Sequence, residues 1–330
     1  MRPRVLFVYQ LPAPFIQQDL ELLERHADVH PFRWTDHRHP ARALSRWMVR
    51  NRRAYDVVFV WFGDLHASAA TRAANLLGKP CILVAGGYDV SDIEGYGFLS
   101  TPRGLRRARA HFQRATRVLA VSGAVRDRLV SQFPETANKV DLVYLGLDAE
   151  RFRPNGPRRR QVLSVAGAEV WTRAWIKGWD RIADVARRLP DVPFTIVGAS
   201  RDVPQRLAPP PNLEVCPPVE RSDLVSRYQA ATVYLQASRF EALSMTVMEA
   251  MACGCVPVVT RVGGLPELVG DAGFIVDEEV GAIADGVRRA LESPAKGATA
   301  RSRVLERFTL RRREEGLVRA LEGVLARSTT

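Results

Sequence analysis

Short apolar runs rich in β-branched residues alternate with amphipathic stretches from one end of the chain to the other. Because the runs are short and almost wholly apolar, they are typical of strands covered on both faces of a sheet. Their alternation with helix-like stretches indicates parallel strands joined by crossover helices. The pattern therefore predicts an α/β fold of doubly wound parallel sheets. The predicted strands are VLFVY, DVVFVW, CILVA, RVLAV, DLVY, QVLSVAG, FTIVG, LEV, TVYLQ, VPVVT and GFIV.

A proline- and arginine-rich segment divides this strand pattern into two halves. The segment RFRPNGPRRR, at 151–160, has the composition of a linker. We therefore expect two Rossmann-like domains, residues 1–153 and residues 154–330, with a ligand-binding cleft between the carboxyl ends of their sheets. A final helix at about 308–326 is expected to pack back on the N-terminal domain.

The composition is that of an ordinary globular protein, with 330 residues of which 46% are hydrophobic. No stretch approaches the roughly 20 apolar residues of a membrane span. The N-terminal segment MRPRVLFVYQLPAP is too short and too proline-broken for a signal peptide, so we expect a cytoplasmic protein. Its cysteines, Cys81, Cys216, Cys253 and Cys255, lie in or beside apolar runs, which favours buried thiols over a zinc site.

The formal net charge of +12 indicates a surface that attracts anions. Arginine recurs at every fourth position from Arg38 to Arg50, and a second cluster spans 103–114. One interpretation is solvated helix faces in an arginine-rich protein. The other is docking on an anionic membrane or a polyanionic acceptor, where each basic residue near the membrane adds about 1 kcal/mol. We expect no nucleic-acid partner, because no recognition-helix or aromatic RNA-binding signature accompanies the charge.

The segment SRFEALSMTVMEAMACGCVPVVTRVGGLPELVG, at 238–270, carries the most chemical information. It predicts a loop, a helix that starts near Ser244 or Thr246 and ends at Gly254, and a strand. Free amides at a helix start favour an anionic phosphate. Glu241 in the loop and Glu249 in the helix are suited to accept hydrogen bonds from neighbouring hydroxyls of a sugar or ribose. The alternatives are a solvated loop acid at Glu241 and a capping box at Glu249.

The spacing E-x7-E, followed by MACG and then GGLPE, resembles the signature of retaining family 4 glycosyltransferases (glycosyltransferase group 1), which have the GT-B fold. This resemblance implies that Glu241 contacts the donor sugar and that Glu249 contacts the ribose of the nucleotide. It also implies an acceptor side in the N-terminal domain and a donor side in the C-terminal domain. The amides implied to hold the diphosphate or sugar belong to Leu243, Ser244, Met245 and Thr246.

Two cations before a predicted helix also resemble the family. In WTRAWIKGWD, Lys177 matches the K-G pair of the family, and Arg173 is the nearest match to its arginine. The resemblance implies that both neutralise the leaving diphosphate in place of a metal; a surface ion pair is the alternative for Arg173. Gly167 stands directly after the first strand of this domain, where the family has G-R. Val219, in a region with two prolines in place of the usual glycine, is implied to lie by the nucleobase.

The N-terminal half departs from the family pattern, because the loop after its first strand contains no glycine. Family members often have a histidine where this chain has Gly86. His66 either takes that polar position beside the reacting sugar or is a structural histidine, and both interpretations stay open. The acceptor-side candidates are Gly86, Gly87, Tyr88 and Asp89.

Together these features imply a metal-independent, retaining hexosyltransferase without a cofactor, for which the nucleotide-sugar is a substrate. A UDP- or GDP-sugar donor and a glycan or lipid-linked acceptor are expected, in cell-surface polysaccharide or glycolipid synthesis. From the arginines at 38–50 and 103–114, we also expect the protein to bind peripherally to the inner face of the membrane. The alternatives are a nucleotide-sugar epimerase or a phosphorylase of the same fold and, outside the enzymes, a basic nucleic-acid-binding protein.

Overall fold

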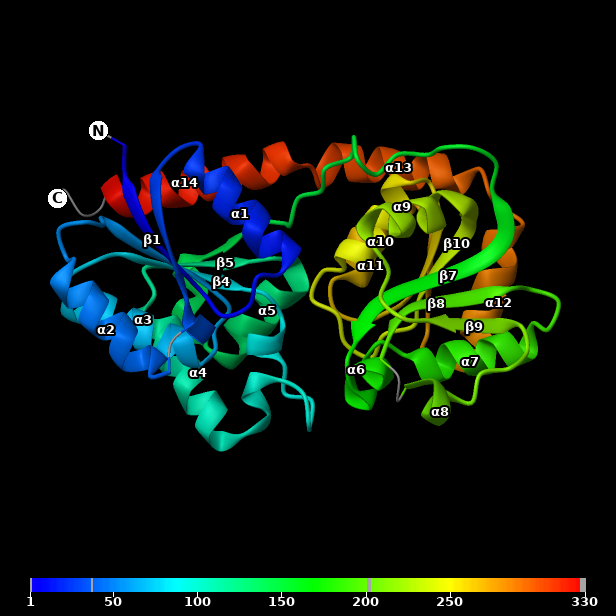
Figure 1. Cartoon of the computed structure of the whole chain (residues 1–330), viewed down its shortest axis with the longest axis horizontal. Coiled ribbons are helices and arrows are strands. Elements are labelled where there is room, and N and C mark those ends of the chain that lie inside the picture. The colour runs from blue at the N-terminus through cyan, green and yellow to red at the C-terminus, as the bar shows by residue number, and fades with distance from the viewer. Residues whose placement is uncertain (1, 37, 201–202, 327–330) are drawn as a thin grey trace. The chain divides into compact units, whose positions relative to one another are not determined.

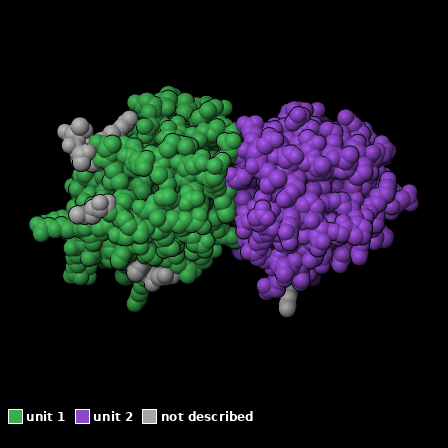
Figure 2. Space-filling view, turned by 90° about the horizontal axis from the view of Figure 1, so that it is seen from above, with its two compact units in different colours: residues 1–146, 310–330 green, residues 147–309 purple. Residues whose placement is uncertain are grey.

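The computed structural model describes residues 2–36, 38–200 and 203–326, and it contains two compact units (Figure 2). Unit 1 comprises Met1–Gly146 and Leu310–Thr330, and unit 2 comprises Leu147–Thr309. The chain passes into unit 2 before the predicted linker, because the amide of Leu147 donates to the carbonyl of Phe308 at 2.8 Å. The last helix, α14 (Leu310–Ala326), belongs to unit 1.

Unit 1 is built on a six-stranded parallel sheet with the order β2-β1-β3-β4-β5-β6. The sequence pattern predicts five of these strands. It misses β2, the edge strand DVHPFR, because only one of its six residues is buried and it has no continuous apolar run. The strands are β1 (Arg4–Tyr9), β2 (Asp28–Arg33), β3 (Val57–Trp61), β4 (Cys81–Ala85), β5 (Arg117–Ala120) and β6 (Val140–Leu142).

Helices cover the sheet of unit 1 (Figure 1). Among them α3 packs against both α2 and α4, while α14 packs against α1 and against β3 and β4. The side chains of Asp64, Thr101 and Ser122 cap α3, α4 and α5 by accepting hydrogen bonds from backbone amides. The helices are α1 (Pro14–Glu24), α2 (Pro40–Arg50), α3 (Leu65–Leu76), α4 (Pro102–Arg114) and α5 (Gly123–Gln132).

A buried ion pair fixes α14 to the rest of unit 1. Arg313 donates to both carboxylate oxygens of Asp19, at 2.9 and 2.5 Å, and also to the carbonyl of Val143 at 2.7 Å. The indole of Trp61 donates to the same carboxylate at 2.9 Å. Because both charged groups are shielded from water and well hydrogen-bonded, removal of either one leaves the other without a counter-charge.

Unit 2 contains a second six-stranded parallel sheet, with the order β12-β11-β10-β7-β8-β9. Trp179, Ile182 and Val185 on one face of α7 belong to its core, as the helical spacing predicts. The strands are β7 (Arg159–Ala168), β8 (Phe194–Ala199), β9 (Leu213–Cys216), β10 (Ala231–Gln236), β11 (Val256–Thr260) and β12 (Phe274–Val276). The helices are α6 (Trp171–Ile176), α7 (Trp179–Arg188), α8 (Val203–Leu207), α9 (Arg221–Ala230), α10 (Met245–Ala252), α11 (Leu265–Val269), α12 (Val280–Leu291) and α13 (Lys296–Arg307).

Two parallel sheets with flanking helices confirm the predicted fold class. All four cysteines are free and buried, as expected. Within the described residues, no helix has the length and apolar character needed to cross a bilayer.

Candidate active site

The helix α10 begins and ends where the sequence predicts. Ser244 is its N-cap, and the Ser244 hydroxyl accepts a hydrogen bond from the amide of Val247 at 3.4 Å. The helix closes at Cys253 and Gly254 before the strand β11. Within the described part of the chain, the amides of Leu243, Ser244, Met245 and Thr246 donate to no other group. A helix start with unused donors is suited to an anion.

Glu241 and Lys177 meet beside this helix start. The Lys177 ammonium lies 2.6 Å from the Glu241 carboxylate, and both side chains are largely buried. The backbone of the two loops is joined as well, because the amide of Arg239 donates to the carbonyl of Ile176 at 2.8 Å. The structure therefore brings together an acid and a cation that the sequence analysis selected separately.

The glycine pair of the GGLPE motif positions Glu241. The amide of Gly264 donates to the Glu241 carbonyl at 3.1 Å. Gly263 has a φ of +51°, and a Cβ atom there would lie 1.7 Å from the same carbonyl oxygen. Only glycine allows this approach, so the motif fixes the loop that carries Glu241.

The sequence analysis missed Arg239, which supports the loop from the other side. Its guanidinium forms a bidentate pair with Asp180, at 2.8 and 2.6 Å. It also lies 4.3 Å from the ring centre of Trp175. Trp175 and Asp180 lie in the segment WTRAWIKGWD, but their separation from Arg239 in the chain, 64 and 59 residues, gave no signal of the contact.

Glu249 is only 7% exposed and faces the helix α9. The hydroxyl of Tyr228 donates to its Oε2 at 2.9 Å, and Arg221 lies 3.6 Å from its Oε1. Burial raises the pKa of the Glu249 carboxyl, while the hydrogen bond from Tyr228 and the positive charges of Arg221 and Arg151 lower it. Because these contacts engage the carboxylate, the capping-box alternative with Thr246 does not describe it. The sequence analysis missed both Tyr228 and Arg221.

The strand β10, which precedes the loop of Glu241, carries a buried tyrosine. Tyr234 on β10 exchanges hydrogen bonds with the backbone of Val165, at 3.0 and 3.2 Å. Burial raises the pKa of Tyr234, and the negative charges of Glu249 and Glu241 raise it further. Both carboxylates therefore act electrostatically on one buried phenol.

Three other predicted donor residues belong to the same unit. Arg173, exposed on α6, donates from Nε to the carbonyl of Gly167 at 3.3 Å. A side chain at Gly167 would meet nothing within 4 Å, so its backbone borders open space. Val219 is half-buried and lies just ahead of α9, the helix that carries Arg221 and Tyr228.

The predicted acceptor-side residues of unit 1 form a tight turn around Asp89. Its buried carboxylate accepts hydrogen bonds from the amides of Gly63, Gly86 and Gly87, at 2.7 to 3.2 Å. Burial raises the pKa of Asp89, and these amides lower it. A Cβ atom at Gly86 would lie 2.2 Å from the ring of Phe62, so a larger residue there would require that ring to shift. Tyr88 is 39% exposed and points its side chain to the surface.

His66 has the position of a structural histidine. Its ring is buried, and its Nε2 lies 2.5 Å from the carbonyl of Trp61. Burial lowers the pKa of His66, so the neutral imidazole is favoured. This placement favours the structural alternative over a role at the reacting sugar, since a buried ring bound to backbone is not presented to a substrate.

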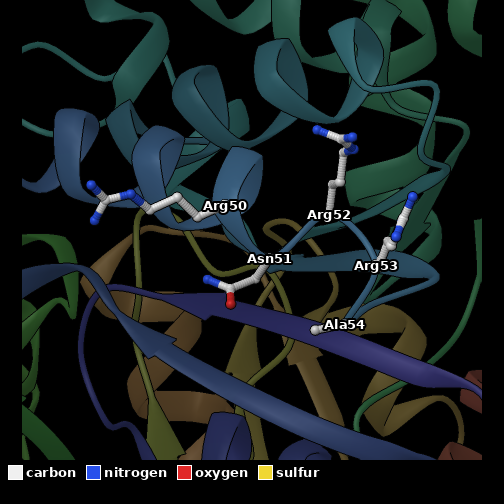
Figure 3. Close-up of a pocket in the computed structure, with 5 residues that line it drawn as sticks. All are labelled: Arg50, Asn51, Arg52, Arg53 and Ala54. Carbon is white, nitrogen blue, oxygen red and sulfur yellow. The ribbon is translucent and has the colours of Figure 1, made fainter.

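One hollow of the structure involves none of these residues. It has a volume of about 510 Å³ and is lined by Arg50–Ala54 at the end of α2, in unit 1. The three arginine side chains there point in different directions rather than toward a common centre (Figure 3). None of the predicted donor residues lines it, so the contacts around Glu241 define the candidate site better than the hollow does. Among the described residues, no group of three histidine, cysteine or acidic side chains is arranged to hold a metal.

Two family models match the chain. Residues 4–151 match the model described as Glycosyltransferase Family 4, and residues 161–293 match the model described as Glycosyl transferases group 1. Together they include every predicted site residue.

Among curated proteins, the chain is 29% identical over 198 residues to D-inositol 3-phosphate glycosyltransferase of Mycolicibacterium paratuberculosis, covering 53% of this chain and 44% of that protein. It is 25% identical over 250 residues to MMP alpha-(1->4)-mannosyltransferase of Mycolicibacterium hassiacum, covering 70% of this chain and 58% of that protein. The chain spans about half the length of the curated relatives that it matches.

Solved structures share the fold along nearly the whole chain. Sucrose-phosphate synthase (tll1590) from Thermosynechococcus elongatus superposes with a TM-score of 0.81 at 14% identity, covering 99% of this chain and 100% of that one. Anabaena Alr3699/HepE in complex with UDP superposes with a TM-score of 0.77 at 18% identity, covering 97% and 100%. At such identities the likeness shows the fold alone.

Proposed function

This chain belongs to the family 4 glycosyltransferases, and from that premise we propose that it transfers a hexosyl group, with retention of configuration, from a nucleotide-sugar to a glycan or lipid-linked acceptor. The observation that carries the proposal is the contact of Lys177 with Glu241 beside the open start of α10. A sugar joined to a diphosphate fits this arrangement. The carboxylate can accept hydrogen bonds from the sugar hydroxyls, and the cation and the free amides can bind the diphosphate. We assign its product to cell-surface polysaccharide or glycolipid synthesis.

Each part of the donor has a matching group in unit 2. The amides from Leu243 to Thr246 bind the diphosphate, and Lys177 neutralises the charge that develops on it as the sugar leaves. Glu241 accepts a hydrogen bond from a hydroxyl of the sugar. Glu249, oriented by Tyr228, accepts hydrogen bonds from the ribose hydroxyls, and Val219 lies beside the base. A UDP-sugar is the first donor to test, because the neighbour HepE was solved with UDP; a GDP-sugar is the second.

Arg173 is the second proposed cation. It is exposed on α6, and among the described residues its side chain is hydrogen-bonded to the Gly167 carbonyl alone, so its guanidinium can turn toward a phosphate. With two protein cations at the diphosphate, the proposed reaction needs neither a metal nor a cofactor. The acceptor is proposed to use the unit 1 surface at Tyr88, with Gly86, Gly87 and Asp89 shaping the turn beneath it.

The arginines of unit 1 suggest that the protein meets its acceptor at a membrane surface. The helices α2 and α4 contain no acidic residue, and each packs against α3. Val49 and Leu105 are exposed apolar residues on the same two helices, at 51% and 37%. A layer of cations with apolar side chains among them suits an anionic leaflet. We propose peripheral binding to the inner face of the membrane, which places a cytoplasmic enzyme beside a lipid-linked acceptor.

A donor and acceptor screen tests the transfer. Purified protein is incubated with UDP-, GDP- and ADP-sugars and with lipid-linked or oligosaccharide acceptors, and the anomeric signals of donor and product are compared by NMR. Retention of the anomeric configuration is expected. A sugar converted without an acceptor would indicate an epimerase, and phosphorolysis of a glycan would indicate a phosphorylase.

Flotation with anionic and neutral liposomes at low and high salt tests the membrane proposal, which fails if neither lipid charge nor salt changes binding.

A further inference from the structure

Arg221 lies against the carboxylate of Glu249 without being hydrogen-bonded to it. Its Nη2 is 3.6 Å from Oε1 of Glu249, which is within ion-pair distance but too long for a hydrogen bond. On another side its guanidinium lies 5.4 Å from the ring centre of Phe152, which is fully buried. The guanidinium is therefore held by charge and by an aromatic face, two interactions that leave its N–H groups unused.

One of those N–H groups is buried. The Nε atom of Arg221 is inaccessible to solvent and has no hydrogen-bond partner within the described residues. A buried donor without a partner costs about 1–3 kcal/mol, so folded proteins rarely leave one without a purpose. The side chain as a whole is 38% exposed, so a ligand can reach the guanidinium from outside. These observations indicate a donor group kept ready at the edge of a site.

Arg221 also lies at the nucleoside end of the proposed donor. It is the first residue of α9, two positions after Val219, and it adjoins the carboxylate that is proposed to accept the ribose hydroxyls. A carboxylate beside a free guanidinium binds a hydroxyl on one side and a hydrogen-bond acceptor on the other. A nucleoside offers both groups. Its ribose hydroxyls can donate to the carboxylate, and acceptor atoms of the base and the ribose oxygens lie next to them.

We propose that Arg221 is a nucleotide-binding residue, which donates hydrogen bonds from its guanidinium to an acceptor atom at the nucleoside end of the donor. The inference rests on the proposed function, because it takes Glu249 as the ribose-binding residue. It adds a contact that depends on this chain's own arrangement of Arg221, Phe152 and Glu249. If Arg221 formed only a structural ion pair, it would compete with the ribose for Glu249, and its removal would leave nucleotide binding unchanged or make it tighter.

Calorimetric titration of the full chain with UDP, GDP and ADP tests this. Among these, the nucleotide that binds the wild type is titrated into Arg221→Gln, Arg221→Lys and, as a control, Arg188→Gln, an exposed arginine of α7. We expect the dissociation constant to rise about tenfold in Arg221→Gln, the loss of one charged hydrogen bond. Arg221→Lys should stay nearly as weak, because an ammonium lacks the planar fork and the Nε donor. The control should bind like the wild type.

Unchanged or tighter binding by Arg221→Gln would overturn the proposal, and so would full rescue by lysine. If the glutamine variant does not fold, the lysine variant, which keeps the charge beside Glu249, decides between the same outcomes. Titration with the 2′-deoxy nucleotide separates two supporting results: the effect of Arg221→Gln disappears if the 2′-oxygen is the acceptor and persists if the base is. A folded wild type that binds none of the three nucleotides contradicts the proposed donor class itself, a different failure from equal binding by wild type and variant.

Discussion

The ammonium of Lys177 lies 2.6 Å from the carboxylate of Glu241, although the two residues are 64 positions apart in the chain. The glutamate comes from the loop after β10 and the lysine from the turn between α6 and α7. In the structure each charge pairs with the other. In the proposed reaction the same two groups bind a hydroxyl and a phosphate of the donor.

We expect Lys177→Met to lower kcat by about a hundredfold, because loss of a cation at a developing negative charge costs about 3 kcal/mol. Glu241→Gln should also lower kcat, because an amide accepts a hydrogen bond from the sugar hydroxyl less strongly than a carboxylate does. Steady-state kinetics with the donor found in the screen measures the change, and circular dichroism checks the fold. Arg288→Gln, which removes an exposed charge on α12, is the matched control. Normal turnover of both site variants would remove the two residues from the reaction.

Gly263→Ala should impair transfer through the position of Glu241. A methyl group at Gly263 would overlap the Glu241 carbonyl, and its φ of +51° is unfavourable for alanine. The loop must therefore move, and we expect kcat to fall at least tenfold with a small loss of stability. Gly323→Ala on α14 is the control, because a Cβ atom there meets nothing within 4 Å. Equal activity of the two variants would show that the glycine does not position the glutamate.

The Asp19–Arg313 pair should dominate the stability of α14. We expect Arg313→Met to lower the free energy of unfolding of unit 1 by about 3–5 kcal/mol, since it leaves the Asp19 carboxylate buried without a counter-charge. Asp19→Leu combined with Arg313→Met should cost less than the two single changes added together. Hydrogen exchange of the α14 amides measures this locally, which avoids treating two units as one transition. Additive costs would contradict the coupling.

His111 should make unit 1 sensitive to acid. Burial lowers the pKa of its imidazole to about 3, well below the usual value near 6.5. Between these two pH values the unfolded chain binds a proton that the folded chain does not, so stability falls as the pH drops through this window. We expect His111→Phe, which keeps an aromatic ring among Phe98 and Phe112, to flatten this part of a plot of Tm against pH. An unchanged slope between pH 6 and 4 would assign the acid sensitivity to other groups.

Local patterns in the sequence were sufficient for the fold class and for the helix that organises the site. The run SMTVMEAMACG predicts a helix that starts near Ser244 or Thr246 and ends at Gly254, and α10 has its N-cap at Ser244. Such a prediction succeeds because capping and helix termination depend on a few adjacent residues. The same reasoning did not predict the edge strand β2, since only one of its six residues is buried and they form no apolar run.

The sequence by itself determined which residue types the site contains: two glutamates at a fixed spacing, a lysine before a helix, and glycines in GGLPE. Only the tertiary structure decided which of them meet. It paired Lys177 with Glu241, placed Tyr228 and Arg221 on Glu249, and turned the Asp89 carboxylate inward onto backbone amides. The physical reason is that these contacts join side chains from separate crossover units. The distances between those side chains depend on the order of the parallel strands in the sheet, and no local sequence pattern contains that order.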